Sequence, residues 1–195
     1  RSSGREMIRR TLFAAALSLA ATPAFAQAIV VGGKNFTEQQ LMAEMTTQLL
    51  RSKGLSVEKR AGLGTGPLRQ AQEAGQVDVY WEYTGTALIT FHGVSDRMYA
   101  AATYATVKEL DAAKGLVWLN PSRANNTYAL AMREAEAGRA GIRTLSDLAE
   151  QVRRGRALKF GCNTEFFIRA DGLKPLEAAY GFSFGGENVV RMDTG

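Results

Sequence analysis

Aromatic side chains and hydroxyls gather where one apolar stretch of the chain ends. Residues 77–86 read Val-Asp-Val-Tyr-Trp-Glu-Tyr-Thr-Gly-Thr, so a β-branched run is followed by Tyr80, Trp81, Tyr83 and Thr86. The faces of aromatic rings can hold a quaternary ammonium, which has no N–H to donate, and each ring contributes about 0.5–2 kcal/mol. Hydroxyls, amides or a cation would hold an attached carboxylate. The stretch therefore indicates a binding site, although packing of the same rings against a sheet is an alternative.

Two further junctions have a similar character. Residues 33–39 read Gly-Lys-Asn-Phe-Thr-Glu-Gln, and residues 125–128 read Asn-Asn-Thr-Tyr. Lys34 and a helix start near Thr37 could hold a carboxylate through positive charge and free backbone N–H groups. Open α/β sheets bind ligands at the carboxyl ends of their parallel strands. We therefore expect the three junctions to share one cleft.

Catalytic chemistry has little support in the sequence. The chain has one histidine and one cysteine, so it lacks multi-cysteine metal sites and disulfides. Asp78 and Glu82 are four positions apart in an extended segment, about 13 Å at about 3.3 Å per residue, which is too far for general acid/base work. We expect both to accept from local backbone donors or to lie at the sheet edge. A secreted enzyme using either carboxylate with His92 is the alternative, but His92 is more simply a surface turn residue.

Other features have ordinary structural explanations. The glycines at 62, 64 and 66 follow a strand as in a dinucleotide site, but the third comes one position early, so a tight turn is the better interpretation. Cys162 is expected to be a small buried residue on a strand. No cofactor is implied.

The elements that must position the three junctions alternate along the first half of the chain. Thr37 and Gln40 match a capping box, and Leu41, Met45 and Leu49 recur at helical spacing, which predicts one buried stripe. A β-α-β-α-β order predicts a parallel sheet. The expected strands are 28–31, 56–60 and 77–81, and the expected helices are 37–51 and 67–74.

The second half continues the α/β pattern after a change of domain near residues 120–126. Thr144 and Asp147 predict the capped start of a helix over 144–154. Residues 134–141 are charged and rich in Ala and Gly, which predicts a loop. The remaining expected elements are helices 99–114 and 175–180 and strands 116–119, 158–162 and 188–192.

Bulk composition is that of a globular protein, with 195 residues, 46% hydrophobic and 22% charged. The net charge is +5, but residues 1–26 hold four Arg and one Glu and account for +3 of it, so the argument for nucleic-acid binding fails.

After Met7, a cationic start, the apolar run 11–21 and Ala24-Phe25-Ala26 predict a signal peptide cleaved near Ala26 and a periplasmic protein. Residues 1–6 precede Met7 and resemble a remnant outside the fold. The cleavage site has no cysteine, so a lipid anchor is not indicated.

At this point the motifs resemble a known family. Four motifs carry the resemblance, at residues 33–39, 62–66, 78–86 and 125–130. In their order and spacing they are similar to the glycine betaine, choline and carnitine receptors of osmoprotectant ABC transporters, the OpuAC/ProX-like family. The similarity extends over about residues 28–195. The resemblance implies an α/β periplasmic binding protein of type II that closes two lobes, 27–123 and 124–195, over a central cleft. It implies no enzymatic chemistry, an inner-membrane permease as partner, and a monomer.

The resemblance also implies site roles for six residues. Tyr83 and Tyr128 would be walls of an aromatic cage, with Thr86, Gln39 and Lys34 near the ligand's carboxylate or the cleft. Arg169, within Phe166-Phe167-Ile168-Arg169, resembles the position of a carboxylate-binding arginine.

Relatives in this family continue beyond the equivalent of residues 192–195 and add a further cage segment and a return to the first lobe. The sequence therefore predicts an incomplete second lobe and C-terminal return segment, and weak binding by this form. The alternatives are a receptor for another zwitterion or an amino acid, and a truncated product without function of its own.

Overall fold

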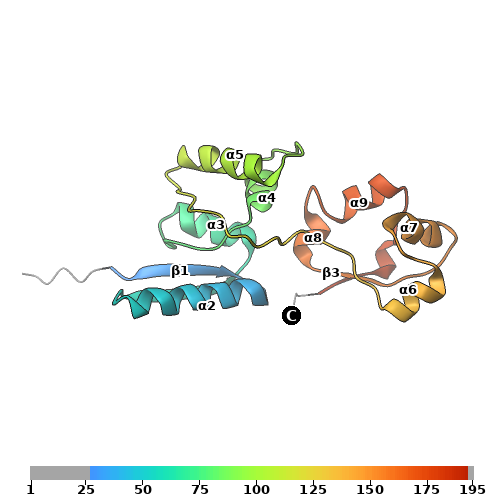
Figure 1. The fold of residues 1–195 in the computed structure, drawn as a ribbon, viewed down its shortest axis with the longest axis horizontal. Helices are drawn as coiled ribbons and strands as arrows, with labels where there is room; N and C mark the ends of the chain where they lie inside the picture. Colours follow the sequence, from blue (N-terminus) through green and yellow to red (C-terminus); the bar gives the residue numbers. More distant parts are fainter. Residues whose placement is uncertain (1–26, 193–195) are drawn as a thin grey trace, which may run out of the picture.

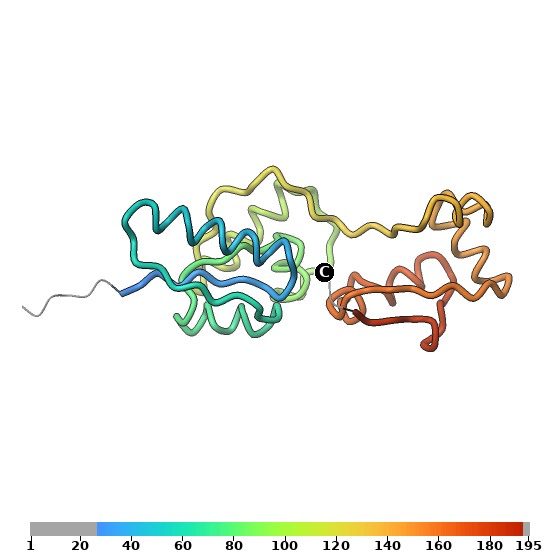
Figure 2. Tube along the Cα trace, turned by 90° about the horizontal axis from the view of Figure 1, so that it is seen from below, coloured from blue at the N-terminus to red at the C-terminus, as the bar shows by residue number. Residues whose placement is uncertain are grey.

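The structure, a computed structural model, describes residues 27–192. Its elements form two groups along the long axis of the molecule, joined by an extended segment that crosses between them (Figures 1 and 2). The N-terminal group contains β1 (Ile29–Lys34), α2 (Thr37–Ser52), β2 (Val57–Leu63), α3 (Thr65–Glu73), α4 (Thr84–Thr86), the π-helical turn η1 (Ala87–Phe91) and α5 (Ala100–Ala112). The C-terminal group contains α6 (Glu134–Ala140), α7 (Leu145–Arg153), β3 (Phe160–Cys162), α8 (Thr164–Ile168), α9 (Leu173–Tyr180), the 3-10 turn η2 (Gly186–Asn188) and β4 (Val189–Arg191).

Each group is built on parallel strands. In the N-terminal group β1 pairs with β2, with Ile29 opposite Val57, and Val31 makes a single parallel bridge to Val79. In the C-terminal group β3 pairs with β4. The parallel arrangement predicted from the β-α-β order is confirmed, but the predicted strand 77–81 is reduced to the one bridge. The fold is mixed α/β, and the predicted lobe boundary at residues 123 and 124 stays a prediction.

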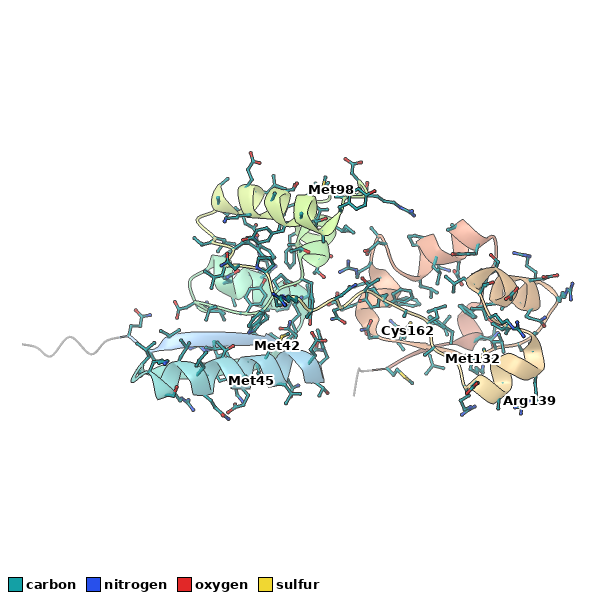
Figure 3. The ribbon with its side chains drawn as sticks, in the orientation of Figure 1. Met42, Met45, Met98, Met132, Arg139 and Cys162 are labelled. Atoms are coloured by element: carbon teal, nitrogen blue, oxygen red, sulfur yellow. The ribbon has the colours of Figure 1, made fainter. Side chains whose placement is uncertain are left out.

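Helix α2 lies against β1 with the face opposite to the one predicted. Leu41, Met45 and Leu49 are 59%, 68% and 59% exposed, so the prediction of a buried apolar stripe is wrong. The buried positions are Gln39, Ala43 and Thr47. Small residues allow this close approach: a Cβ on Gly33 would lie 2.9 Å from the Cβ of Ala43 and 3.3 Å from the backbone oxygen of Gln39, both on α2. Figure 3 labels Met45 on this helix.

Of the two helix caps predicted from the sequence, one is confirmed and one is wrong. The capping box of α7 is confirmed, because the hydroxyl of Thr144 accepts from the backbone N–H of Asp147 and the Asp147 carboxylate accepts from that of Thr144. The box predicted at Thr37 is wrong, since Phe36 is the N-cap of α2 and makes no side-chain cap bond. The loop predicted over 134–141 is also wrong. Residues 134–140 form α6, which ends at Gly141 with φ of 66°, and one internal glycine does not prevent a helix.

The single histidine belongs to a buried polar cluster. Asp111 is fully buried and accepts from His92 Nε2 at 2.8 Å, from Trp118 Nε1 at 2.6 Å and from the guanidinium of Arg69. His92 does lie in a turn, as predicted, but its side chain is only 9% exposed, so the predicted surface position is wrong. The cluster ties α3, η1 and α5 to the segment after α5.

The C-terminal group has its own apolar core. Cys162 is buried in it, as predicted, and Phe160 stacks on Phe184 with ring centroids 4.5 Å apart. Residues 116–119 form no strand, contrary to prediction, because within residues 27–192 no neighbouring strand pairs with them. Throughout the described residues, no helix has the length and apolar character needed to span a membrane.

Candidate functional site

Lys34 ends β1 and is almost completely buried, with 2% of its side chain exposed. Its ammonium lies 2.5 Å from Oε1 of Glu82. The same carboxylate accepts from the backbone N–H of Tyr83 at 2.7 Å and from the hydroxyl of Tyr80 at 3.0 Å. The expectation that Glu82 accepts from local backbone is confirmed. Asp78 also accepts from a backbone N–H, but the donor is Val30 of β1, 48 positions away. The Lys34 charge is therefore already neutralised.

Tyr83 lies where two of the three sequence junctions meet. Its ring stacks on Phe36 with centroids 6.3 Å apart, and the Lys34 ammonium lies 5.1 Å from the ring centroid. Its hydroxyl donates to Oε1 of Glu38 at 3.0 Å. Burial raises the pKa of Tyr83 to about 12; Glu38 also raises it, whereas nearby Gln39 and the side chain of Asn126 lower it. Asn126 belongs to the third junction, so all three converge on one phenol.

Gln39 carries an unsatisfied amide beside this phenol. The residue is 1% exposed, and neither Nε2 nor Oε1 has a hydrogen-bond partner among the described residues. A buried polar group without a partner costs about 1–3 kcal/mol, and most buried polar side-chain atoms in proteins are paired. The amide of Gln39 therefore has unused hydrogen-bonding capacity, and its atoms are closed off from solvent in this structure.

Arg169 connects the two groups of elements. Its Nη1 donates to the hydroxyl of Thr86 at 2.8 Å. Nε and Nη2 donate to the two carboxylate oxygens of Asp171 at 2.7 and 2.9 Å. The guanidinium carbon lies 5.9 Å from the centroid of the Tyr128 ring, and that ring packs on Phe166 at 4.9 Å. Burial is the largest single influence on Arg169 and lowers its pKa, but the hydrogen bond and charge of Asp171, together with Tyr128 and Glu165, outweigh it and raise the pKa.

The six residues singled out from the sequence thus fall into two connected clusters. In the first cluster, Lys34 and Gln39 lie beside the phenol of Tyr83. The second cluster consists of Thr86, Tyr128 and Arg169. Helix α4 joins the two, because Tyr83 is its N-cap and Thr86 its last residue. Sequence reasoning gave no site role to four neighbours in these clusters, Phe36, Glu38, Asn126 and Asp171. The first three lie in the motifs that were quoted, and Asp171 follows Arg169 by two positions.

Two cavities lie away from these clusters. One of about 220 Å³ is lined by α6 and residues 156–158, and Figure 3 shows Met132 and Arg139 at the end of the molecule distant from α2. The other, of about 170 Å³, lies beside α5 and residues 115–118. Among residues 27–192 no group of three His, Cys, Asp or Glu side chains could hold a metal ion.

Sequence comparison decides the family. The model of the OpuAC family, described as the substrate binding domain of the ABC-type glycine betaine transport system, matches residues 27–194. The chain belongs to the OpuAC family. Members of this family are binding proteins and not enzymes, so the secreted-enzyme alternative is set aside.

Individual relatives agree with the OpuAC assignment. The glycine-betaine-binding protein of Pseudomonas aeruginosa is 43% identical over 97% of this chain, and the glycine betaine-binding protein YehZ of Escherichia coli is 35% identical over 87%. The solved structure of apo YehZ matches with a TM-score of 0.56, 33% identity and 87% of this chain covered. A glycine betaine/carnitine/choline ABC transporter structure matches with a TM-score of 0.59 over 85% of this chain and, at 20% identity, supports the fold alone.

The OpuAC relatives are longer than this chain. The matched region spans 63% of the Pseudomonas aeruginosa protein and 57% of YehZ. It covers 62% and 61% of the two solved chains.

Proposed function

We propose that the protein is the periplasmic substrate-binding component of an ABC importer and captures quaternary-ammonium osmoprotectants, such as glycine betaine, choline or carnitine, for an inner-membrane permease. In this proposal the two groups of elements are the lobes of a type II periplasmic binding protein, and the ligand enters the cleft between them. The family assignment supports a glycine betaine-type substrate.

One observation carries the choice of ligand class. Each of the two tyrosines has a cation over its ring: the Lys34 ammonium lies 5.1 Å from the Tyr83 centroid, and the Arg169 guanidinium lies 5.9 Å from that of Tyr128. Both rings therefore sit where a positive charge can use the π face. A trimethylammonium group can be held in the same way. Its remaining polar part would find the unsatisfied amide of Gln39.

The proposal is tested by calorimetric titration of the protein with glycine betaine and choline. Tyr83→Ala and Tyr128→Ala should each weaken binding about 2- to 30-fold, the range that corresponds to about 0.5–2 kcal/mol per ring. Tyr99→Ala is the matched control, because Tyr99 is 93% exposed and lies outside both clusters. Affinity unchanged in both site variants would remove the cage.

The cargo is separated from other zwitterions by competition. A relative from Helicobacter pylori, 32% identical over 80% of this chain, is named an ergothioneine transport permease and binding protein. Ergothioneine and a neutral amino acid therefore belong in the panel beside glycine betaine, choline and carnitine. Displacement of bound choline by ergothioneine alone would move the proposal to a different cargo.

Export is the remaining part of the proposal. The expected signal peptide falls in residues 1–26, outside the described residues. We expect expression in a Gram-negative host to place the protein in the osmotic-shock fraction with a mature N-terminus at Gln27. A protein retained in spheroplasts with residues 7–26 intact would contradict the periplasmic location.

A further inference from the structure

A cavity of about 220 Å³ lies in the C-terminal group, between the end of α6 and the segment that follows α7. Three charged side chains line it, Glu136, Arg139 and Arg156. Its apolar lining includes Met132, Ala140 and Leu158. Figure 3 labels Met132 and Arg139 at this end of the molecule. The cavity thus combines charged groups from two elements with an apolar wall.

The two arginines of the cavity are not neutralised by carboxylates. Among residues 27–192 neither Arg139 nor Arg156 has a carboxylate oxygen within 4 Å. The carboxylate of Glu136 is held instead by Arg133, whose Nη2 lies 2.8 Å from its Oε1. Arg133 has the largest effect in lowering the pKa of Glu136, and the charges of Arg139 and Arg156 lower it further. Both guanidiniums therefore lie near the one carboxylate of the cavity without pairing with it.

The arginines are also not needed to close the helices beside the cavity. At the end of α6 the N–H of Ile142 donates to the carbonyl of Ala137 at 2.9 Å, and at the end of α7 the N–H of Arg156 donates to that of Gln151 at 3.1 Å. Both are the long bond of a Schellman motif, in which a glycine of positive φ ends the helix. The backbone satisfies these carbonyls itself, so the side chains of Arg139 and Arg156 are not committed to them.

This lining fits an organic anion of small size. A guanidinium presents paired N–H groups that match the two oxygens of a carboxylate. The apolar wall gains from a ligand whose remaining part is apolar, whereas an inorganic anion would leave that wall unused. The volume of about 220 Å³ is below the about 300–1,000 Å³ of sites for drug-sized ligands. The ligand is therefore a carboxylate on a single ring or a short branched chain.

We propose that the cavity binds a small carboxylate with an apolar body, and that Arg139 of α6 and Arg156 after α7 hold its charge. The cavity shares no residue with the two clusters around Tyr83 and Tyr128. The proposal therefore goes beyond the proposed function and does not depend on it.

The test titrates isotope-labelled protein with benzoate, benzamide and acetate and follows the backbone amide signals of residues 139–141 and 156–158 by NMR. Benzamide has the shape of benzoate without the charge, and acetate has the charge without the ring. Benzoate should shift these signals saturably and bind about 5-fold more tightly than either of the other two. Its affinity should fall as salt is added, because salt screens the arginine charges.

Charge variants locate the site. Arg139→Gln and Arg156→Gln should each weaken benzoate about 3- to 10-fold and leave benzamide unchanged. Glu136→Gln should strengthen benzoate severalfold, because it removes the negative charge of the cavity. Arg154→Gln is the matched control: Arg154 is two positions from Arg156, but it pairs with Glu150 and does not line the cavity, so benzoate affinity should not change.

Melting temperatures show whether each variant is folded, and the comparison of benzoate with benzamide needs the parent protein alone. The proposal is overturned if benzoate causes no saturable shift at residues 139–141 and 156–158, or if it binds no more tightly than benzamide. Equal benzoate affinity of the parent and the folded Arg139→Gln and Arg156→Gln variants would also overturn it. None of these outcomes concerns quaternary ammonium compounds, so the proposed function would stand.

Discussion

The guanidinium of Arg169 donates a 2.8 Å hydrogen bond to the hydroxyl of Thr86, across 83 positions of sequence. The bond joins α4 of the N-terminal group to the end of α8 in the C-terminal group, because Arg169 is the C-cap of α8. It belongs to the same cluster as Tyr128. The spacing of the two groups is thus linked to a residue of the candidate site.

Thr86→Val should therefore loosen this link. Removing the hydroxyl leaves one guanidinium N–H without its partner and should cost about 1 kcal/mol. We expect a larger radius of gyration in small-angle X-ray scattering, while Thr86→Ser, which keeps the hydroxyl, should match the parent. Identical scattering of the Val and Ser variants would show that the bond does not control the spacing.

The Asp111 cluster should make stability dependent on pH. Burial alone would raise the pKa of Asp111, but hydrogen bonds from Arg69 and Trp118 outweigh it and lower the pKa to about 2. Because the folded-state pKa lies below the unfolded value of about 3.9, the contribution is complete above pH 4 and is lost as the pH falls towards 2. The shift corresponds to about 2–3 kcal/mol. Urea unfolding between pH 7 and 2 measures it.

Trp118→Phe tests the origin of that shift. The indole donates to Asp111 at 2.6 Å, so its loss should raise the pKa of Asp111 towards the unfolded value. The difference in unfolding free energy between parent and variant should be largest near neutral pH and shrink below pH 3. Trp81→Phe is the control, because Trp81 is 41% exposed and donates to Thr46 instead. A difference for Trp118→Phe that does not vary with pH would contradict the account.

Two glycines should respond to alanine in opposite ways. A Cβ on Gly172 would lie 2.0 Å from the backbone oxygen of Phe166, which cannot move aside cheaply, whereas a Cβ on Gly138 in α6 meets nothing within 4 Å. Gly172→Ala should destabilise the protein severely. Gly138→Ala should stabilise it by about 0.5–1 kcal/mol, since glycine is unfavourable inside a helix. Thermal unfolding of both variants checks the pair, and similar melting temperatures would refute the geometry at Gly172.

The start of α7 offers a local test. Thr144→Ala removes the acceptor for the N–H of Asp147 and should lower stability by about 1 kcal/mol. Ser146→Ala changes an exposed hydroxyl on the same helix and should have little effect. Circular dichroism during urea unfolding compares them. Equal losses in the two variants would mean that the cap contributes nothing specific.

Features that depend on residues close together in the sequence could be predicted, and features that depend on residues far apart could not. The cap at Thr144 was predictable because its partner is three residues away, and the parallel pairing of β1 with β2 followed from the β-α-β order. The burial of α2 was not, because periodicity shows that Leu41, Met45 and Leu49 share a face but not which face meets the sheet. The bond between Lys34 and Glu82 joins residues 48 positions apart and has no local signal.

The site shows the same limit. Its six residues could be chosen because motifs at strand-to-helix junctions converge, and Tyr83 does meet residues of the other two junctions. Their roles as ligand contacts stay a prediction. The engagement of Arg169 by Asp171 and Thr86, and the unpaired amide of Gln39, depend on side-chain placement in three dimensions and could not have been foreseen.

Helix α2 presents Leu41, Met45 and Leu49 to water along one ridge. Apolar surface of this kind associates readily with other apolar surfaces. During purification the protein should adhere to phenyl-type resins, enhance the fluorescence of hydrophobic dyes while still folded, and lose solubility as ammonium sulfate is added. Charged residues at these three positions would be the first changes to make for crystallisation.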